Sequence, residues 1–274
     1  MLANENKLLR ETAEYIMSKI KRAPDALMIL GSGLGNFAER IENPLILPYG
    51  DIPNFLVSTV PGHAGRLVVG DIGDKYVAIM QGRFHYYEGY AMDKITFPVK
   101  AFAVMGTPTL IATNAAGIVN KDFNPTELMV LTDHINLMFN NPLIGQNNEE
   151  LGSRFPDMTE VYTKELRQLA LDIAKREKIP LQSGVYAAMS GPCYETPAEV
   201  KMVRALGGDA VGMSTVPETT VAHYCGMKCL GISCMTNYGA GITNEELNHE
   251  EVLANSQTAN EYFCNLLYSI VIEM

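Results

Sequence analysis

Short apolar segments that stop at glycine-rich or polar motifs alternate with helical patterns along most of this chain of 274 residues. The first segment, residues 26–30, reads Ala-Leu-Met-Ile-Leu and runs directly into the glycine-rich residues 31–35. Strands that alternate with helices form a mostly parallel or mixed sheet covered on both faces. No Pro/Gly/Ser-rich linker is long enough to divide the chain. We therefore predict an α/β fold in one domain, residues 1–274, with a central mixed β-sheet flanked by helices.

Hydrophobic periodicity places the individual elements. Helices are expected where apolar residues recur every three or four positions, and strands where short apolar runs end at turn residues. We predict helices near residues 8–20, at 92–106 with a kink at Pro98, and at 164–177, 197–206, 217–225 and 249–272. We predict strands at 26–30, 66–71, 76–81, 109–113, 128–132, 184–189, 210–213 and 229–235, of which 66–71 and 76–81 form a hairpin.

Charge and hydropathy indicate which kinds of partner and which cellular location this protein has. The formal net charge is −10, and the lysines and arginines are scattered, whereas nucleic-acid binders gather them in a basic patch. No apolar run approaches the roughly 18 residues of a membrane-spanning helix, and residues 1–22 lack the apolar core of a secretory signal. We expect a cytoplasmic protein with no nucleic-acid or membrane partner, in which a local site holds any anionic ligand.

The cysteines point to the same compartment. There are five, an odd number, which favours reduced thiols over a disulfide framework. Cys225, Cys229 and Cys234 lie close together in sequence, but their spacing does not match C-x-x-C and their neighbours are apolar. A metal site and a place in the core are both open for this group, and the core is favoured.

Three motifs could hold an anion. The glycines at 31–35 let the backbone turn sharply and present N–H groups, with the Ser32 hydroxyl beside them, although a plain turn between a strand and a helix explains them equally well. In residues 82–89, Arg83 offers a planar fork for an oxyanion and His85 follows two positions later; a surface arginine with a packed histidine is the alternative. His63 stands in a glycine-rich turn, where apolar packing does not explain it.

Polar groups also gather at the ends of later strands. Thr196 and Glu199 match a helix capping box. The capping box does not require Glu195, so the carboxylate of Glu195 could contact a ligand. Ser214 or Thr215 could cap the helix that begins at residue 217, and one hydroxyl is then left for a ligand.

The small residues 113–117 and the polar pair Thr236–Asn237 also end predicted strands. In α/β sheets, ligands bind beyond the carboxyl ends of the strands. The motifs together place arginine, histidine, serine, glutamate and asparagine there, with Tyr87 and Tyr194 as flat faces. This combination suits a small polar ligand that carries an anionic group and a planar ring.

The ordered set of motifs in this chain closely resembles that of a known family. The ordered motifs G-S-G-L-G, V-P-G-H-A-G, G-R-F-H-Y-Y-E-G, T-N-A-A-G, T-D-H-I-N-L, G-P-C-Y-E-T-P-A-E, V-G-M-S-T-V-P-E and N-H-E-E-V-L are similar to those of the trimeric purine nucleoside phosphorylases. The resemblance implies the nucleoside phosphorylase fold, a homotrimer and a site near a subunit boundary. It also implies no metal and no cofactor, since inorganic phosphate is a substrate.

The resemblance assigns roles to residues of this chain. For phosphate it implies Ser32, His63, Arg83, His85, the backbone of Ala115 and Ser214. For the purine it implies Tyr194, Glu195 and Asn237, and for the ribose Tyr87, Met213 and His249, with Phe155 closing the ribose pocket of a neighbouring subunit. Asn237, Glu195 and His85 are the residues expected to take part in catalysis.

The implied reaction is the reversible phosphorolysis of inosine and guanosine, or their deoxy forms, to free purine and (deoxy)ribose 1-phosphate in purine salvage. Glu195 is expected to accept the N1–H that only 6-oxopurines carry, and Asn237 to contact N7 and O6. Methylthioadenosine phosphorylase is the alternative within the fold; those enzymes place an aspartate near the position of Asn237. A non-catalytic purine-binding protein is the alternative from a different class.

Overall fold

The computed structural model describes residues 2–57, 64–243 and 249–274, with side chains in the last range from residue 254 onward. In this part of the chain nine strands form one sheet in the order β2-β3-β4-β1-β5-β8-β7-β6-β9. The strands are β1 (Ala26–Leu30), β2 (Glu42–Pro48), β3 (Arg66–Ile72), β4 (Lys75–Gln81), β5 (Thr109–Ile118), β6 (Leu128–Leu137), β7 (Leu181–Met189), β8 (Ala210–Gly212) and β9 (Lys228–Tyr238).

The last strand in this order, β9, also pairs with β5. The run β5-β8-β7-β6-β9 therefore closes on itself as a small barrel, and β1, β4, β3 and β2 extend from it as an open sheet. Parallel pairs such as β1–β4 and β5–β9 occur beside antiparallel pairs such as β3–β4 and β6–β9. The predicted α/β fold with a mixed sheet is confirmed.

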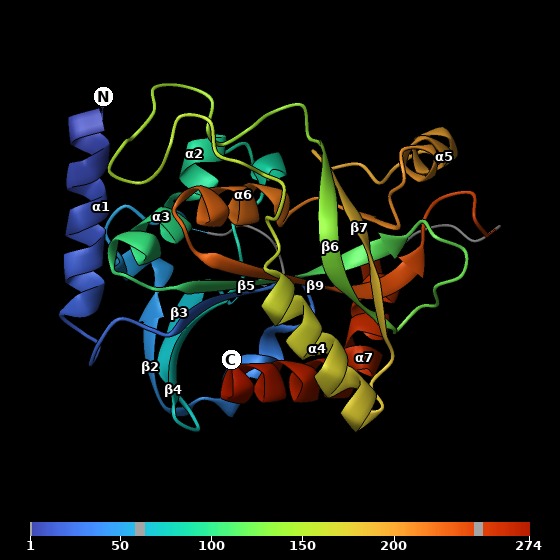
Figure 1. Cartoon of the computed structure of the whole chain (residues 1–274), viewed down its shortest axis with the longest axis horizontal. Helices are drawn as coiled ribbons and strands as arrows, with labels where there is room; N and C mark the ends of the chain where they lie inside the picture. The colour runs from blue at the N-terminus through green and yellow to red at the C-terminus, as the bar shows by residue number, and fades with distance from the viewer. Residues whose placement is uncertain (1, 58–63, 244–248) are drawn as a thin grey trace.

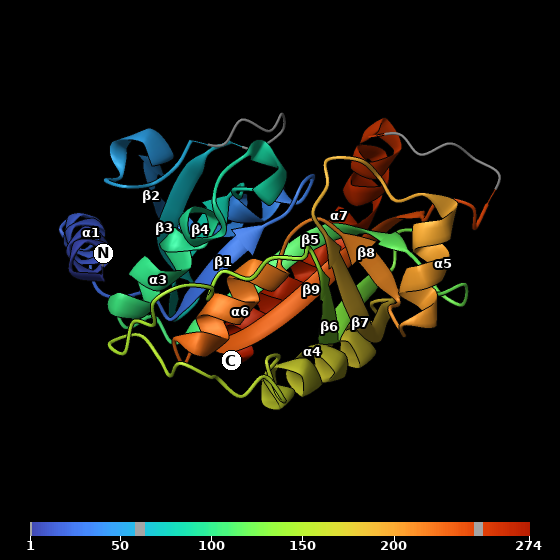
Figure 2. The same cartoon turned by 90° about the horizontal axis from the view of Figure 1, so that it is seen from above.

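Helices cover both sides of the strands, as Figure 1 shows for β5 and β9 in the middle of the molecule. The helices are α1 (Leu2–Met17), α2 (Met92–Ile95), α3 (Phe97–Val104), α4 (Lys164–Glu177), α5 (Pro197–Ala205), α6 (Val216–Tyr224) and α7 (His249–Glu273), and η1 (Gly35–Arg40), η2 (Tyr49–Asp51) and η3 (Tyr86–Glu88) are short 3₁₀ turns. In the view of Figure 1, α3 and α6 lie above β5 and β9, and α4 and α7 lie below. Figure 2 shows α1 at one end of the molecule, where it packs against α3, and α5 at the other end.

Two apolar cores lie between these layers. All five residues of β1 are buried, and their side chains alternate between the cores. Leu27 and Ile29 pack in the core that includes α3 and α6, while Met28 and Leu30 pack in the core that includes α4 and α7. Successive side chains of a strand point to opposite faces, so a fully apolar strand is what a sheet covered on both sides requires.

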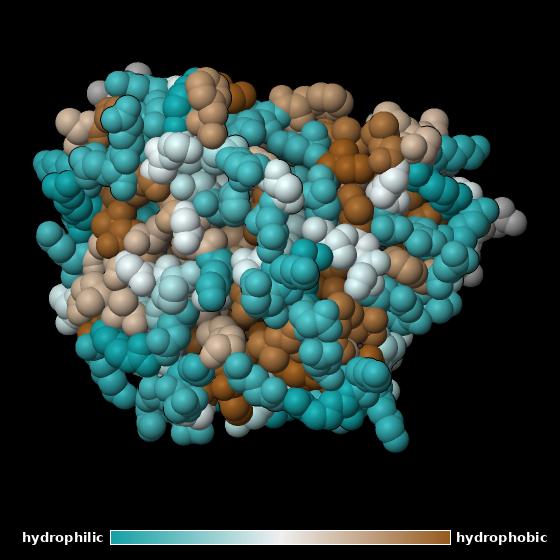
Figure 3. Space-filling view, viewed as in Figure 1, coloured by the Kyte–Doolittle hydropathy of each residue, from teal (hydrophilic) through white to brown (hydrophobic). Residues whose placement is uncertain are grey.

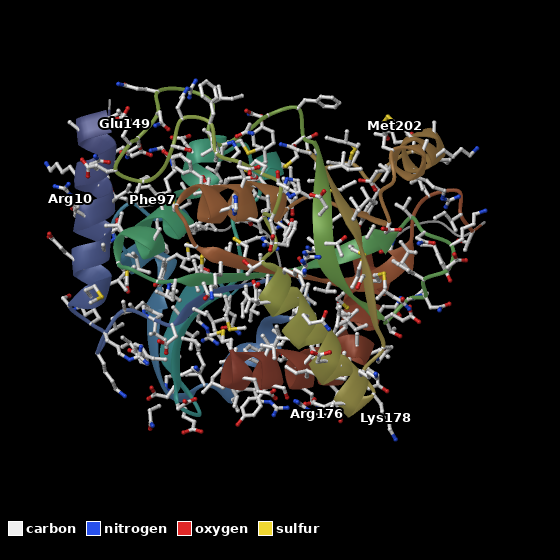
Figure 4. The ribbon with its side chains drawn as sticks, in the orientation of Figure 1. Arg10, Phe97, Glu149, Arg176, Lys178 and Met202 are labelled. Atoms are coloured by element: carbon white, nitrogen blue, oxygen red, sulfur yellow. The ribbon has the colours of Figure 1, made fainter. Side chains whose placement is uncertain are left out.

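Smaller contacts fix the outer helices. Phe97, labelled in Figure 4, packs with Leu9 of α1 in a separate apolar cluster. Arg176, near the end of α4, binds the carboxylate of Glu273 at the end of α7 at 2.5 Å. In Figure 3 hydrophilic residues predominate on the face shown, and apolar residues form separate patches, one of them at the upper right over the ends of β6 and β7.

Most predicted elements have their expected places, including the hairpin of β3 and β4, and α4 has the predicted bounds. Three strands run further than predicted: β5, β6 and β9 continue through motifs that we expected to follow them. Strand pairing explains this. The ends of β5 and β9 pair with each other, with ladder partners such as Ala115 and Cys234, and the end of β6 pairs with β7. Residues 92–106 divide into α2 and α3 at Thr96, and Pro98 lies in the first turn of α3. Strand β2 was not predicted.

The cysteines are all free, and Cys229, Cys234 and Cys264 are buried. Burial raises the pKa of the thiols of Cys229 and Cys234 to about 12. This confirms the core interpretation for these two residues; Cys225 is only half-buried. Within the described ranges, no helix is both long and apolar enough to cross a bilayer.

Candidate active site

One pocket collects most of the side chains that the sequence singled out. It is lined by residues from the ends of β1, β4, β5, β8 and β9 and from the loop before α5. Ten of the predicted site residues are among them: Ser32, Arg83, His85, Tyr87, Ala115, Tyr194, Glu195, Met213, Ser214 and Asn237. Strands remote in sequence therefore deliver these groups to one place, as expected for ligands beyond strand ends.

Arg83 is the cation of this pocket among the residues that line it. It follows β4, and its side chain is only 2% exposed although it faces the pocket. Its Nη1 donates to the carbonyl oxygen of Thr113 at 2.5 Å, and its Nε donates to Oε1 of Glu218 at 2.9 Å. These two acceptors fix the plane of the guanidinium, which is the geometry that a bidentate contact with an oxyanion needs.

The glycine-rich turn after β1 comes close to β5. A Cβ atom on Gly31 would lie 2.7 Å from Cα of Asn114, so a larger residue would push the two segments apart. The Gly31 amide donates to the hydroxyl of Thr113 at 3.2 Å. This close approach brings Ser32 to the same pocket as Ala115.

His85 and Tyr87 form one wall of the pocket. Their rings stack with centroids 4.6 Å apart and an interplanar angle of 19°. The carboxylate of Glu88 accepts a hydrogen bond from the His85 amide at 2.7 Å and lies 3.4 Å from Nδ1 of the ring. Burial lowers the pKa of His85, and burial raises the pKa of Tyr87 to about 12, so both rings are neutral at neutral pH.

Ser214 lies in a strained turn before α6. The amide of Val216 donates to the Ser214 carbonyl at 2.8 Å, and Thr215 between them has φ 72° and ψ −50°. This is the geometry of a γ-turn with positive φ, which is rare and costly for a β-branched residue. The Thr215 side chain makes no cap to α6, so the predicted side-chain cap at this helix is wrong. Its hydroxyl instead accepts a hydrogen bond from the Asn114 amide at 2.9 Å.

Glu195 enters the pocket from the loop before α5. The predicted capping box is confirmed, since the Thr196 hydroxyl and the Glu199 carboxylate each accept from the other's backbone amide. Glu195 takes no part in it. Its Oε1 is buried and has no hydrogen-bond partner in the described part of the chain. Burial raises the pKa of this carboxyl, because desolvation disfavours its charged form.

Asn237 is on β9 and not in a loop after it. Its Oδ1 accepts from the Thr236 hydroxyl at 2.8 Å, and its Nδ2 donates to the Tyr238 carbonyl at 3.1 Å. Tyr194, next to Glu195, is 41% exposed at the rim. The pocket thus brings together a cation, hydroxyl groups, a carboxylate and an amide.

Three predicted site residues are not placed in this pocket. His63 lies outside the described residues, and His249 begins α7 but its side chain is outside the described ones. Phe155 lies between β6 and α4, is 87% exposed and does not line this pocket. Its expected contact with a neighbouring subunit stays a prediction.

Two residues of this region were not singled out from the sequence, although each belongs to a motif that was. Asn114 lines the pocket and holds Thr215, and Glu218 binds Arg83 from behind. An acidic residue in the first turn of a helix, as Glu218 is, is ordinarily explained by the helix dipole. The described side chains contain no group of three or more residues that could hold a metal ion.

Comparisons with known proteins agree with this geometry. The family model described as the Phosphorylase superfamily matches residues 25–272. A curated relative, purine nucleoside phosphorylase 1 of Geobacillus stearothermophilus, is 52% identical over 266 residues, 97% of each chain. Purine nucleoside phosphorylase of Rattus norvegicus is 44% identical over 272 residues, 95% of this chain and 94% of the relative.

Solved structures match as well. A Schistosoma purine nucleoside phosphorylase in complex with hypoxanthine superposes with a TM-score of 0.93 at 36% identity, covering 97% of this chain and 96% of that one. A Schistosoma mansoni purine nucleoside phosphorylase in complex with adenosine gives a TM-score of 0.92 at the same identity and coverage.

Proposed function

This chain belongs to the phosphorylase superfamily, and we propose that within it the chain acts as a purine nucleoside phosphorylase. The reaction is the reversible phosphorolysis of purine nucleosides to free purine and ribose 1-phosphate, a glycosyl transfer. The observation that carries the proposal is that Arg83 and Glu195, a fixed cation and a buried carboxylate with an oxygen left for a donor, line one pocket.

The chemistry requires two opposite charges to be stabilised. Cleavage of a glycosidic bond leaves an oxocarbenium-like sugar, while the departing base gathers negative charge. Phosphate held by Arg83, Ser32 and Ser214 attacks the anomeric carbon and is also the counter-charge for the sugar. Holding the nucleophile in line can contribute several kcal/mol, as effective molarities of positioned reactants show. The neutral rings of His85 and Tyr87 supply a hydrogen-bonding wall that adds no charge.

Glu195 and Asn237 recognise the purine base by hydrogen bonds. Glu195 accepts the N1–H of a 6-oxopurine at Oε1, and Asn237 contacts N7 and O6. An adenine has no N1–H, so it leaves the buried carboxylate unpaired, at a cost of roughly 1–3 kcal/mol. The chain therefore turns over inosine and guanosine faster than adenosine. Since a related enzyme has been crystallised with adenosine, selectivity is to be measured as kcat/KM and not as binding.

The alternatives within and outside the fold are less well supported. Methylthioadenosine phosphorylases place an aspartate in the region of β9 where this chain has Asn237. A purine-binding protein without activity needs no fixed arginine and no serine hydroxyl groups in the pocket that holds the purine. Comparison of inosine with methylthioadenosine cleavage separates the first alternative, and release of ribose 1-phosphate separates the second.

A homotrimer is part of the proposal. The segment between β6 and α4 exposes Phe139, Ile144 and Phe155, each by 76% or more. Large exposed apolar side chains in one segment are typical of an interaction site. Phe155 then reaches the ribose pocket of a neighbouring subunit.

Free cysteines agree with a cytoplasmic location. The proposed reaction needs no cofactor, because phosphate is the second substrate.

The test is hypoxanthine release from inosine with and without inorganic phosphate. The proposal expects release that depends on phosphate and saturates with it. Release at an equal rate without phosphate would identify a hydrolase, and no release with inosine or guanosine would refute the proposal.

A further inference from the structure

Glu218 lies behind the candidate phosphate site and is not among the residues that line the pocket. It stands in the first turn of α6, and its side chain is 4% exposed. Its Oε1 accepts from Nε of Arg83 at 2.9 Å. Its Oε2 is buried and has no hydrogen-bond partner in the described part of the chain. This carboxylate therefore binds the residue that faces the anion.

The first consequence is geometric. Glu218 takes the Nε edge of the guanidinium, and the Thr113 carbonyl takes Nη1. An arginine side chain has several flexible bonds, and two fixed acceptors remove that freedom before the ligand arrives. The guanidinium is then preorganised for phosphate.

The second consequence is electrostatic. Arg83 is 2% exposed, and an uncompensated cation at that depth would attract a dianion strongly. Glu218 offsets its charge from behind, and Glu88, with a side chain 2% exposed, adds another carboxylate beside His85. Phosphate must react, and the sugar phosphate must leave. Affinity for the ground state beyond what saturation requires does not raise the rate.

We propose that Glu218 is a positioning residue that orients the Arg83 guanidinium toward phosphate and, by offsetting its charge, limits the affinity of the site for that anion. This rests on the proposed function, since it presumes that phosphate binds at Arg83. The alternative is that Glu218 only allows Arg83 to be buried, as any counter-ion would.

Two variants separate the effects. Glu218→Gln keeps the shape and an oxygen that accepts from Nε, but it removes the charge. Glu218→Ala removes both. For Glu218→Gln we expect the phosphate KM to fall by about fivefold or more, the order expected for one partly screened charge, with a lower kcat and an inosine KM within about twofold of wild type. For Glu218→Ala we expect the phosphate KM to rise by about fivefold or more, because the guanidinium is no longer held.

Glu5→Gln is the matched control. Glu5 of α1 binds the buried Lys100 of α3 at 2.7 Å and does not line the pocket. This variant also removes a carboxylate from a buried cation, so we expect a lower thermal midpoint and an unchanged phosphate KM.

Thermal unfolding with and without inorganic phosphate gives a second measurement. In Glu218→Gln phosphate becomes the counter-ion of Arg83. Saturating phosphate should therefore raise the thermal midpoint of Glu218→Gln more than that of wild type. The shift of Glu5→Gln should equal that of wild type. Equal shifts in all three proteins, or a phosphate KM that rises in both Glu218 variants, would overturn the inference. A wild-type enzyme with no phosphate-dependent activity would instead refute the proposed function, and the midpoint shifts would still decide the role of Glu218.

Discussion

The side-chain amide of Asn114 donates a hydrogen bond of 2.9 Å to the hydroxyl of Thr215. This contact joins β5 to the γ-turn that carries Ser214, and both side chains are buried. Thr215 has a positive φ, a conformation that costs on the order of 1–3 kcal/mol and persists only where surrounding contacts enforce it. The contact with Asn114 is one of those that hold the turn in place.

Thr215→Val should therefore lower the free energy of unfolding by about 1–3 kcal/mol, because the buried Asn114 donor loses its acceptor while the branched shape is kept. It should also lower kcat/KM, since Ser214 is less well held. Urea unfolding and steady-state kinetics measure the two effects. Thr215→Ser keeps the hydroxyl and is the control. A valine variant as stable as the serine variant would show that the contact does not hold the turn.

Glu195→Ala should lower kcat/KM for inosine by at least about 100-fold, the order seen when one preorganised polar contact is lost. Its stability should not fall, because Oε1 has no partner in the described part of the chain and burial already raises the pKa of the carboxyl. Steady-state kinetics and a thermal midpoint test this pair of outcomes. Near-wild-type turnover would remove Glu195 from base recognition.

Asn237→Asp should raise the ratio of adenosine to inosine turnover, because a carboxyl can take a proton and then donate to the ring of a 6-aminopurine. The Thr236 hydroxyl donates to Oδ1 in either case, so the side chain keeps one anchor. The comparison of kcat/KM for the two nucleosides is the measurement, and an unchanged ratio would refute the role given to Asn237.

The pH dependence of stability should reflect His85. Burial lowers its pKa, so His85 binds a proton less strongly in the folded state than in the unfolded state. That contribution is fully present above the ordinary value of about 6.5 and is lost as pH falls toward the lower pKa of the folded state. His85→Gln should therefore lose less thermal stability than wild type between pH 7 and pH 5. Equal losses in both proteins would contradict the buried, neutral ring.

The sequence predicts the alternation of strands and helices because apolar runs and turn residues are local signals. Residues 26–30 and 164–177 are found as expected, since their patterns are uninterrupted. The ends of β5 and β9 are not predictable locally. Residues such as Ala115 and Asn237 have low strand preference, and pairing between the two strands is what extends them.

The site shows the same division. The side chains of Arg83, Glu195 and Asn237 could be named from their motifs, but their meeting in one pocket depends on how β4, β5 and β9 are ordered in the sheet. Glu218 belongs to one of these motifs, but neither the motif nor periodicity predicts that it binds Arg83. Its contact with Arg83 spans 135 positions of sequence, and local chemistry already accounts for an acid in that helix turn.

In the proposed reaction, phosphate is the group that receives the sugar. The decisive measurement is phosphorus NMR of a reaction that contains inosine, inorganic phosphate and the full chain, with hypoxanthine measured in parallel. We predict one ribose 1-phosphate for each hypoxanthine formed, and reformation of inosine when both products are supplied. Hypoxanthine that appears with free ribose, or the absence of both products, would contradict it.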